Sequence, residues 1–234
     1  MKFNADKCQV IRFTNKRSPA KHGYILHGQP LEEVTSAKYL GLNLDPKLNW
    51  NGHVAATCKK ANRTRAFIQR NTYHCPQAIR EMCYHTFIRP TLEYASPNWD
   101  PSTQKSAKQL ESIQRRCARY VTREYAQTTS VTGLLEDLGW PTLQQRRAQA
   151  RVILLYRIVY RLVDINPDLY LTPAASNTTR GHDKRYQIPQ STILAHQHSF
   201  FPRTVRTWNQ LPQSLIHAPT IEAFRLGLSG VLLA

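Results

Sequence analysis

Acidic side chains are scarce in this sequence of 234 residues. It has 15 Asp and Glu against 32 Lys and Arg, so the formal net charge is +17. Residues 1–100 carry 15 basic and 7 acidic side chains, residues 101–161 carry 11 and 4, and residues 162–234 carry 6 and 4. A surface this positive repels itself and is typical of proteins that bind a polyanion. We therefore expect residues 1–161 to contact nucleic acid, although a merely basic, solvated surface is the alternative.

Long apolar runs are absent as well. The longest, Val152–Tyr156, is far too short to span a bilayer. Charges at Lys2, Asp6 and Lys7 interrupt the start, which excludes a secretory signal there. The five cysteines are odd in number and irregularly spaced, which argues against a disulfide framework and fits a reducing compartment. The sequence thus predicts an intracellular protein, nuclear or cytoplasmic, with no transmembrane segment.

Catalytic motifs of hydrolases and nucleotide-binding enzymes are also missing. We find no phosphate-binding glycine loop, no nucleophile elbow and no credible Ser/His/Asp set. A zinc site was weighed for His74, Cys75, Cys83, His85, His196 and His198. These residues lack a tight Cys-x-x-Cys spacing, and Cys83 suits the apolar face of a helix. We predict no metal site in this chain.

Short strands are predicted near the N-terminus, over residues 7–14, 23–30 and 37–44. β-forming residues fill these segments, and Gly23 and Gly28 punctuate them. They are expected to form an antiparallel three-stranded patch. Its apolar face and free edge have no covering element, which predicts low solubility or oligomers.

Helical patterns dominate the remainder. In the segment 51–71, Lys59, Arg63 and Arg70 fall within about 40° of each other, opposite an apolar face that Arg65 interrupts. Further helices are expected over 77–88 (ended or kinked by Pro90), 103–123, 132–138, 142–163 and 220–228. Gly139 is expected to close the helix 132–138, and Thr142 to cap the helix that follows. Residues 96–102 read as a loop in which Trp99 is a packing anchor, and Arg89 and Glu93, four residues apart, could pair. Residues 166–192 read as a linker, and 199–212 as either a strand–turn element or a short helix whose aromatic residues pack onto the helices or stack on bases. The predicted class is mainly α with a small antiparallel β patch (α+β), organised as residues 1–50, 51–165 and 166–234.

Four phrases occur in a suggestive order. They are Phe3–Cys8 (Phe-Asn-Ala-Asp-Lys-Cys), Tyr39–Gly41 (Tyr-Leu-Gly), Arg89–Pro101 (Arg-Pro-x-Leu-Glu-Tyr-x-Ser-x-x-Trp-x-Pro) and Ser199–Pro212. Together they resemble the C-terminal part of a non-LTR (LINE-type, jockey-like) retrotransposon reverse transcriptase. The resemblance implies the end of a palm, a helical thumb-like bundle and a following helical region. Met1 fits an internal methionine of the longer family sequence, so a fragment is expected.

The resemblance assigns roles to several residues. Lys7 matches a palm lysine beside the incoming triphosphate, with an ordinary edge-strand lysine as the alternative. Lys38, Tyr39 and Gly41 match a primer-grip hairpin, with a core tyrosine and a bulge glycine as the alternative. The thumb-like helices imply phosphate contacts with an RNA–DNA or RNA duplex. The candidates for these contacts are Lys59, Lys60, Arg63, Arg70, Arg115, Arg116, Arg119 and Arg123, with solvated helix faces as the alternative.

Polymerisation requires acidic residues that hold two divalent metals. The sequence has no Asp-Asp pair, and its adjacent carboxylates, Glu32-Glu33 and Glu136-Asp137, suit solvated positions. We therefore predict no catalytic residues and no cofactor here, with Mg²⁺ expected only for the intact polymerase. A missing upstream half could act as a partner and supply catalysis in trans. A domesticated scaffold that binds protein instead is the remaining alternative.

Overall fold

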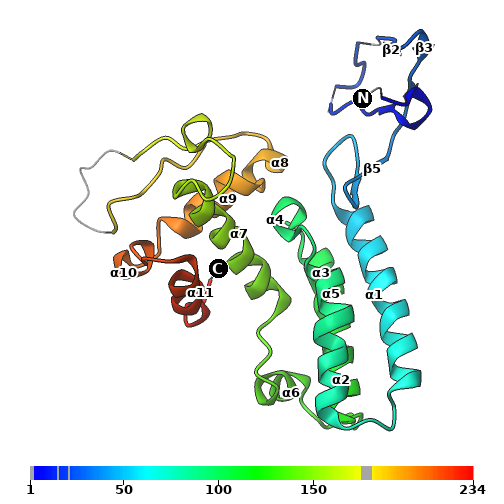
Figure 1. The fold of residues 1–234 in the computed structure, drawn as a ribbon, viewed down its shortest axis with the longest axis vertical. Helices are drawn as coiled ribbons and strands as arrows, with labels where there is room; N and C mark the ends of the chain where they lie inside the picture. Colours follow the sequence, from blue (N-terminus) through cyan, green and yellow to red (C-terminus); the bar gives the residue numbers. More distant parts are fainter. Residues whose placement is uncertain (1–2, 15, 21, 175–180, 234) are drawn as a thin grey trace.

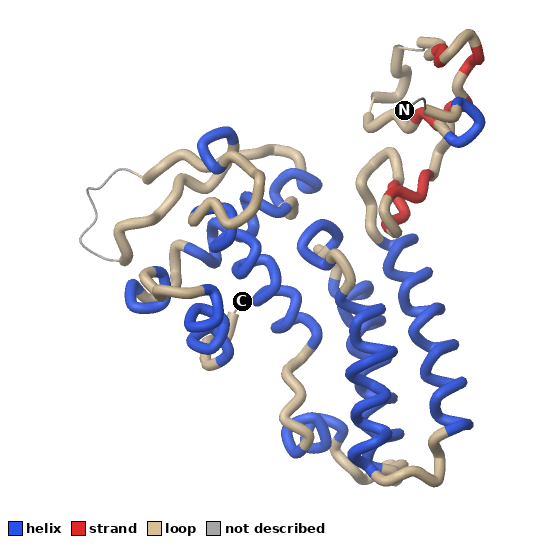
Figure 2. The backbone as a smooth tube through the Cα atoms, in the orientation of Figure 1, coloured by secondary structure: helices blue, strands red, loops and turns tan. Residues whose placement is uncertain are grey.

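The computed structural model describes residues 3–14, 16–20, 22–174 and 181–233. The protein is mainly α-helical, and its strands are confined to the segment before the first long helix (Figure 1, Figure 2). This confirms the predicted class. Part of the predicted linker, residues 175–180, lies outside the described residues, as do Met1 and Lys2.

The strands pair in three two-stranded sheets. These are β1 (Gln9–Val10) with β4 (Glu32–Glu33), β2 (Ile25–Leu26) with β3 (Gln29–Pro30), and β5 (Ala37–Tyr39) with β6 (Leu42–Leu44). The predicted three-stranded antiparallel patch was wrong, since β1 pairs with β4 in parallel and the other two sheets are separate hairpins. The reason lies in the loops His27–Gly28 and Leu40–Gly41, where φ is positive at both residues. Such two-residue loops fold each strand back onto its immediate neighbour.

The segment before residue 51 has little interior. None of its described residues is buried, and several large apolar side chains are exposed. The most exposed are Phe3, Ile25, Tyr39 and Leu40, each at 65% or more. The expectation of an uncovered apolar face is confirmed, while the low solubility it implies stays a prediction.

Helix α1 (Asn51–Asn71) has the predicted bounds and the predicted faces. On the inner face Val54, Ala61 and Ile68 are buried and Cys58 is partly buried. Lys59, Arg63 and Arg70 are exposed. Arg65, which interrupts the apolar face, is partly buried and donates from Nη1 to Gln69 Oε1 at 2.6 Å. A neighbour one turn along therefore satisfies one donor of Arg65, while its buried Nε has no partner among the described groups.

A continuous helical rod follows α1. It consists of α2 (Gln77–Cys83), the π-helical turn η2 (Tyr84–Ile88) and α3 (Arg89–Glu93). The expected end of the helix at Pro90 was wrong, because helical structure runs on to Glu93, while the alternative of a kink there stays a prediction. Proline crowds the preceding turn and removes an amide donor, and the wider π turn lies where that crowding would occur.

Three helices complete the first group: α4 (Ser96–Trp99), α5 (Gln104–Thr122) and α6 (Val131–Asp137). The predicted loop at 96–102 therefore contains a helical turn, and it holds Trp99 fully buried. Thr103 caps α5 by accepting the Ser106 amide. Gly139 follows α6 at φ +64°, as the sequence predicts.

The second group is built around α7 (Leu143–Val159), whose start is capped by Thr142 as predicted. It also contains α8 (Leu194–Gln197), α9 (Phe200–Trp208), α10 (Gln213–Ile216) and α11 (Ile221–Ser229), besides the 3₁₀ turn η3 (Pro167–Leu169). A helix therefore occupies most of 199–212, where the sequence left two alternatives. Another 3₁₀ turn, η1 (Ala5–Lys7), precedes β1.

Two apolar cores correspond to these groups. The first extends from Val54 to Leu143 and the second from Ala148 to Leu233. The division falls inside α7, so this helix joins the two cores covalently. Figure 1 shows α1, α3 and α5 side by side, with α7, α9 and α11 beside them.

Candidate nucleic-acid interface

The β5–β6 hairpin is attached to the helices by two hydrogen bonds. The hydroxyl of Tyr94 donates to the Leu40 carbonyl at 3.1 Å, and the Asn43 amide donates to Nδ1 of His53 at 3.3 Å. Burial lowers the pKa of His53, which favours the neutral ring that can accept this bond. The phrases Tyr39–Gly41 and Arg89–Pro101, far apart in the sequence, therefore touch.

Gly41 is required at the tip of this hairpin for two reasons. Its φ is +84°, which L side chains rarely adopt, and a Cβ would lie 3.2 Å from Cε1 of Tyr94. The close approach at Gly41 in this structure is thus made by the Tyr94 ring.

A groove with a volume of about 370 Å³ lies between the hairpin and α1. Lys38 and Gly41 line it from the hairpin, Lys60 from α1 and Tyr94 from the end of α3. The structure therefore brings predicted primer-grip residues together with a predicted phosphate-contact residue. Tyr39 is 65% exposed and does not line the groove.

The cations predicted on α1 form one exposed set, here called the α1 cationic face. Its members are Lys59, Lys60, Arg63 and Arg70. Across the described part of the chain, none of the four forms an ion pair or a side-chain hydrogen bond. The face is therefore available to an external anion.

The arginines predicted on α5 divide into two kinds. Arg119 donates to the carbonyls of the following loop, including those of Glu124 and Ala126 at 3.0 Å. Arg123 is no longer helical, because it occupies the C-cap at φ +65°, donates to the Tyr73 carbonyl and lies 5.0 Å over the Tyr73 ring. The side chains of Arg119 and Arg123 therefore stabilise the fold through their hydrogen bonds to backbone carbonyls.

Arg115 and Arg116 remain closer to the prediction. Arg115 is exposed and reaches Oγ1 of Thr132 at 3.5 Å, a marginal contact. Arg116 is exposed and has no partner within the described segments. Lys7 is likewise exposed, at the end of η1, and its side chain forms no hydrogen bond or ion pair with a described group.

Ion pairs fix the phrase Arg89–Pro101 in place. Arg89 lies 3.9 Å from Glu93, which confirms the predicted pair. Arg146 of α7 binds both oxygens of the same carboxylate through Nε and Nη2. Trp99, predicted as a packing anchor, is fully buried and donates from Nε1 to the Tyr94 carbonyl at 2.7 Å.

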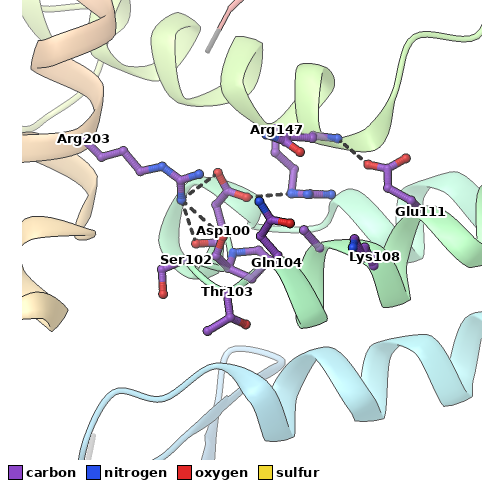
Figure 3. A pocket seen from close by; sticks show the side chains of 11 residues that line it. Asp100, Ser102, Thr103, Gln104, Lys108, Glu111, Arg147 and Arg203 are labelled. Atoms are coloured by element: carbon purple, nitrogen blue, oxygen red, sulfur yellow. Dashed lines mark hydrogen bonds and ion pairs between the residues drawn. The ribbon is translucent and has the colours of Figure 1, made fainter.

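A buried ionic cluster around Asp100 was not predicted from the sequence. Arg147 Nε lies 2.7 Å from Oδ1 of Asp100, and Arg203 Nη1 lies 3.2 Å from Oδ2 (Figure 3). Arg151 also pairs with Oδ2. Asp100 lies within the phrase Arg89–Pro101 and Arg203 within the phrase Ser199–Pro212, so the cluster joins the two phrases. The available signal was the spacing of Arg147 and Arg151, four residues apart and so on the same side of α7.

The aromatic residues of the tail pack inward. Trp208 is fully buried and donates from Nε1 to the Lys184 carbonyl at 2.8 Å. Phe200 and Phe201 are partly buried against the second core. This agrees with packing rather than base stacking as their role.

Metal ligands are not gathered in the described residues: no group of three or more His, Cys, Asp or Glu is placed to hold an ion. Of the zinc candidates, His85 pairs with Glu81 at 3.5 Å. The sequence-adjacent carboxylate pairs Glu32-Glu33 and Glu136-Asp137 are exposed, and Glu33 pairs with Arg12 at 3.0 Å.

Among the described helices, none combines the length and the apolar character needed to cross a membrane.

Comparison with known proteins gives two relatives, both from Drosophila melanogaster. One is a probable RNA-directed DNA polymerase from transposon BS, 26% identical over 151 residues, which cover 62% of this chain and 16% of that protein. The other is a probable RNA-directed DNA polymerase from transposon X-element, 25% identical over 126 residues, or 51% of this chain and 13% of that protein. No protein-family model and no solved structure matches the chain. The similarities relate about half of this chain to the RNA-directed DNA polymerases of transposons.

Proposed function

We propose that this chain is part of a retrotransposon reverse transcriptase and grips the template–primer duplex through the α1 cationic face and the β5–β6 hairpin. The supporting observation is the groove in which Lys38 and Gly41 meet Lys60. Cations that have no protein partner bind phosphates by releasing counterions from the nucleic acid. The relatives' names describe polymerases directed by RNA, so an RNA–DNA or RNA duplex is the expected ligand.

The contacts we propose are to phosphates and carry no sequence information. Lysine and arginine on a helix face hold the backbone of a duplex and leave the base edges unread. Lys59, Lys60, Arg63 and Arg70 are the principal contacts. Arg115 and Arg116 are secondary contacts. Arg119 and Arg123 are no longer candidates, because their side chains already bind backbone carbonyls.

Polymerisation is proposed to need an upstream half. Two divalent metals require several convergent carboxylates, and Glu32-Glu33 and Glu136-Asp137 are exposed on separate elements. The chain spans about one sixth or less of its relatives' length. In the intact polymerase, Mg²⁺ is held elsewhere, and Lys7 lies on the triphosphate side of the palm.

A protein-binding role is the second candidate, and exposed apolar residues favour it. Phe67 on α1, Met82 on α2 and Phe87 on η2 are each more than half exposed. An apolar helix interface does not weaken as salt rises, whereas phosphate binding does. The missing upstream half, or a different protein partner, would cover such residues.

Fluorescence anisotropy with a labelled RNA–DNA hybrid tests the first candidate. The variant Lys60→Glu/Arg63→Glu replaces two cations of the α1 cationic face. The matched control Arg206→Glu/Arg225→Glu makes the same change of charge at exposed positions on α9 and α11. We expect the first variant to weaken binding at least about tenfold and to lower the salt slope by about 2, with much smaller effects in the control. Equal losses in both variants would contradict a local grip.

A primer-extension assay tests the catalytic proposal. The chain alone, supplied with Mg²⁺ and nucleotides, should not extend a primer. Extension by this chain alone would overturn the proposal, whereas extension only after mixing with an upstream half would show that catalysis is supplied in trans.

A further inference from the structure

A second cavity lies at the N-terminal end of α5, away from the groove beside α1. Its volume is about 310 Å³, and α5, α7 and α9 all contribute side chains to its wall. Lys108 comes from α5, Arg147 from α7 and Arg203 from α9 (Figure 3). Three cations from three helices thus surround one space.

Positive charge in this region exceeds negative charge. The single carboxylate of Asp100 faces three guanidinium groups, of which Arg147 and Arg151 are almost fully buried. Glu111 also lines the cavity, but its oxygens accept the Leu143 and Gln144 amides, at 3.2 Å and 2.8 Å, at the start of α7. Buried charge without a partner is costly, so the excess calls for an anion.

Arg147 has donor capacity left over. The residue is 1% exposed, its Nε is used by Asp100, and its Nη1 has no hydrogen-bond partner among the described groups. A guanidinium offers five donors in a planar fork, a geometry that matches phosphate oxygens. The oxygen of a bound phosphoryl group would accept a hydrogen bond from this unused donor of Arg147.

The N-terminal turn of α5 adds free backbone donors and positive charge to the wall of the cavity. The hydroxyl of Thr103 accepts a hydrogen bond from the Ser106 amide, and its carbonyl accepts one from the Ala107 amide. In the described structure the amides of Gln104 and Lys105 have no acceptor. This helix is 19 residues long, so its first turn carries the positive end of a full helix dipole. Gln104 and Thr103 also line the cavity.

The electrostatics of the arginines point the same way. Burial lowers the pKa of Arg147, although the charges of Glu111 and Glu93 oppose this shift, and burial together with the charge of Arg147 lowers the pKa of Arg203. Like charges held this close repel each other, and an anion between them would relieve that repulsion.

We propose that this cavity, here called the α5 anion site, binds a phosphoryl group. Arg147 and Arg203 hold its oxygens from one side, the first-turn amides of α5 from the other, and Lys108 stands at the mouth. The phosphoryl group belongs either to a nucleic-acid strand or to free phosphate, since both present the same oxygens. The site does not depend on the proposed grip by α1.

Thermal unfolding of the full chain in inorganic phosphate, against chloride at equal ionic strength, tests this site. We expect a saturable rise in Tm of about 3–6 °C when phosphate reaches ten times its Kd. Lys108→Glu should lose at least half of the rise. Arg116→Glu, the same change of charge at an exposed position farther along the same helix and outside the cavity, should keep most of it. No rise in the unmodified chain, or the same rise in both variants, would overturn the proposal.

Competition identifies the source of the phosphoryl group. If a nucleic-acid strand supplies it, saturating phosphate at constant ionic strength should weaken RNA–DNA binding by the unmodified chain but not by Lys108→Glu. If duplex binding is unchanged while Tm still rises, the site takes free phosphate. The Tm experiment needs no duplex, so failure of the grip and failure of this site are distinguishable.

Discussion

Removing the charge of Asp100 should be among the most damaging single changes in this protein. The side chain is 4% exposed, and it is the only carboxylate among the described residues that pairs with Arg147, Arg151 and Arg203. Asp100→Asn keeps the shape of the side chain but leaves three guanidinium groups without their counter-charge. Breaking a buried pair by removing one partner costs about 3–5 kcal/mol.

An exposed pair provides the control. Arg161 and Asp168 lie 3.0 Å apart, with side chains 68% and 74% exposed. Asp168→Asn makes the same chemical change, yet an exposed pair contributes about 0–1 kcal/mol. The difference between the two variants therefore measures how much burial adds to the cost of removing the carboxylate charge.

Urea denaturation followed by circular dichroism measures both variants. We expect Asp100→Asn to lower the free energy of unfolding by about 3–5 kcal/mol and Asp168→Asn by less than about 1 kcal/mol. Asp100 also joins the two helical groups through Arg203, so the transition of the variant should become less cooperative. A loss below about 1 kcal/mol for Asp100→Asn would refute the importance assigned to the cluster.

Two further predictions concern the β5–β6 hairpin. Gly41→Ala and Gly28→Ala both place a side chain at positive φ, at about 1–2 kcal/mol each, but only Gly41 meets Tyr94. Gly41→Ala should therefore reduce hydrogen-exchange protection in its hairpin more than Gly28→Ala does in the other, and it alone should weaken duplex binding; equal effects would argue against docking on Tyr94. The pKa of His53 is lower in the folded chain than in the unfolded chain, so as the pH falls the imidazole is protonated first in the unfolded chain. The free energy of unfolding should therefore fall as the pH drops below about 6.5, by at most about 1.4 kcal/mol per pH unit. His53→Gln should make this fall shallower in urea melts at pH 5.5, 6.5 and 7.5, and an unchanged pH dependence would contradict the role given to Asn43 and His53.

Features set by local chemistry were predictable from the sequence. The two faces of α1 follow from its helical period, and Thr142 caps the helix that it was expected to cap. A three-stranded patch was expected because Gly28 read as punctuation between strands, whereas His27 and Gly28 form the loop inside a hairpin. A non-glycine residue at positive φ leaves no clear mark in a sequence.

Long-range contacts were beyond sequence reasoning. Arg203 and Asp100 are separated by 103 positions, and no periodic pattern links them. The contact of Tyr94 with Leu40 spans 54 positions, although both belong to phrases that carried the family resemblance. Likewise, only the structure shows that Arg119 binds loop carbonyls while Arg116 is exposed on the same helix.

The salt dependence of RNA–DNA hybrid binding tests the proposed grip most directly. Four phosphate contacts from the α1 cationic face predict a slope of log K against log salt of about −3 to −4 between 50 and 200 mM salt. An absence of binding at low salt, or a slope near zero, would contradict the account and favour a protein-binding role for these helices.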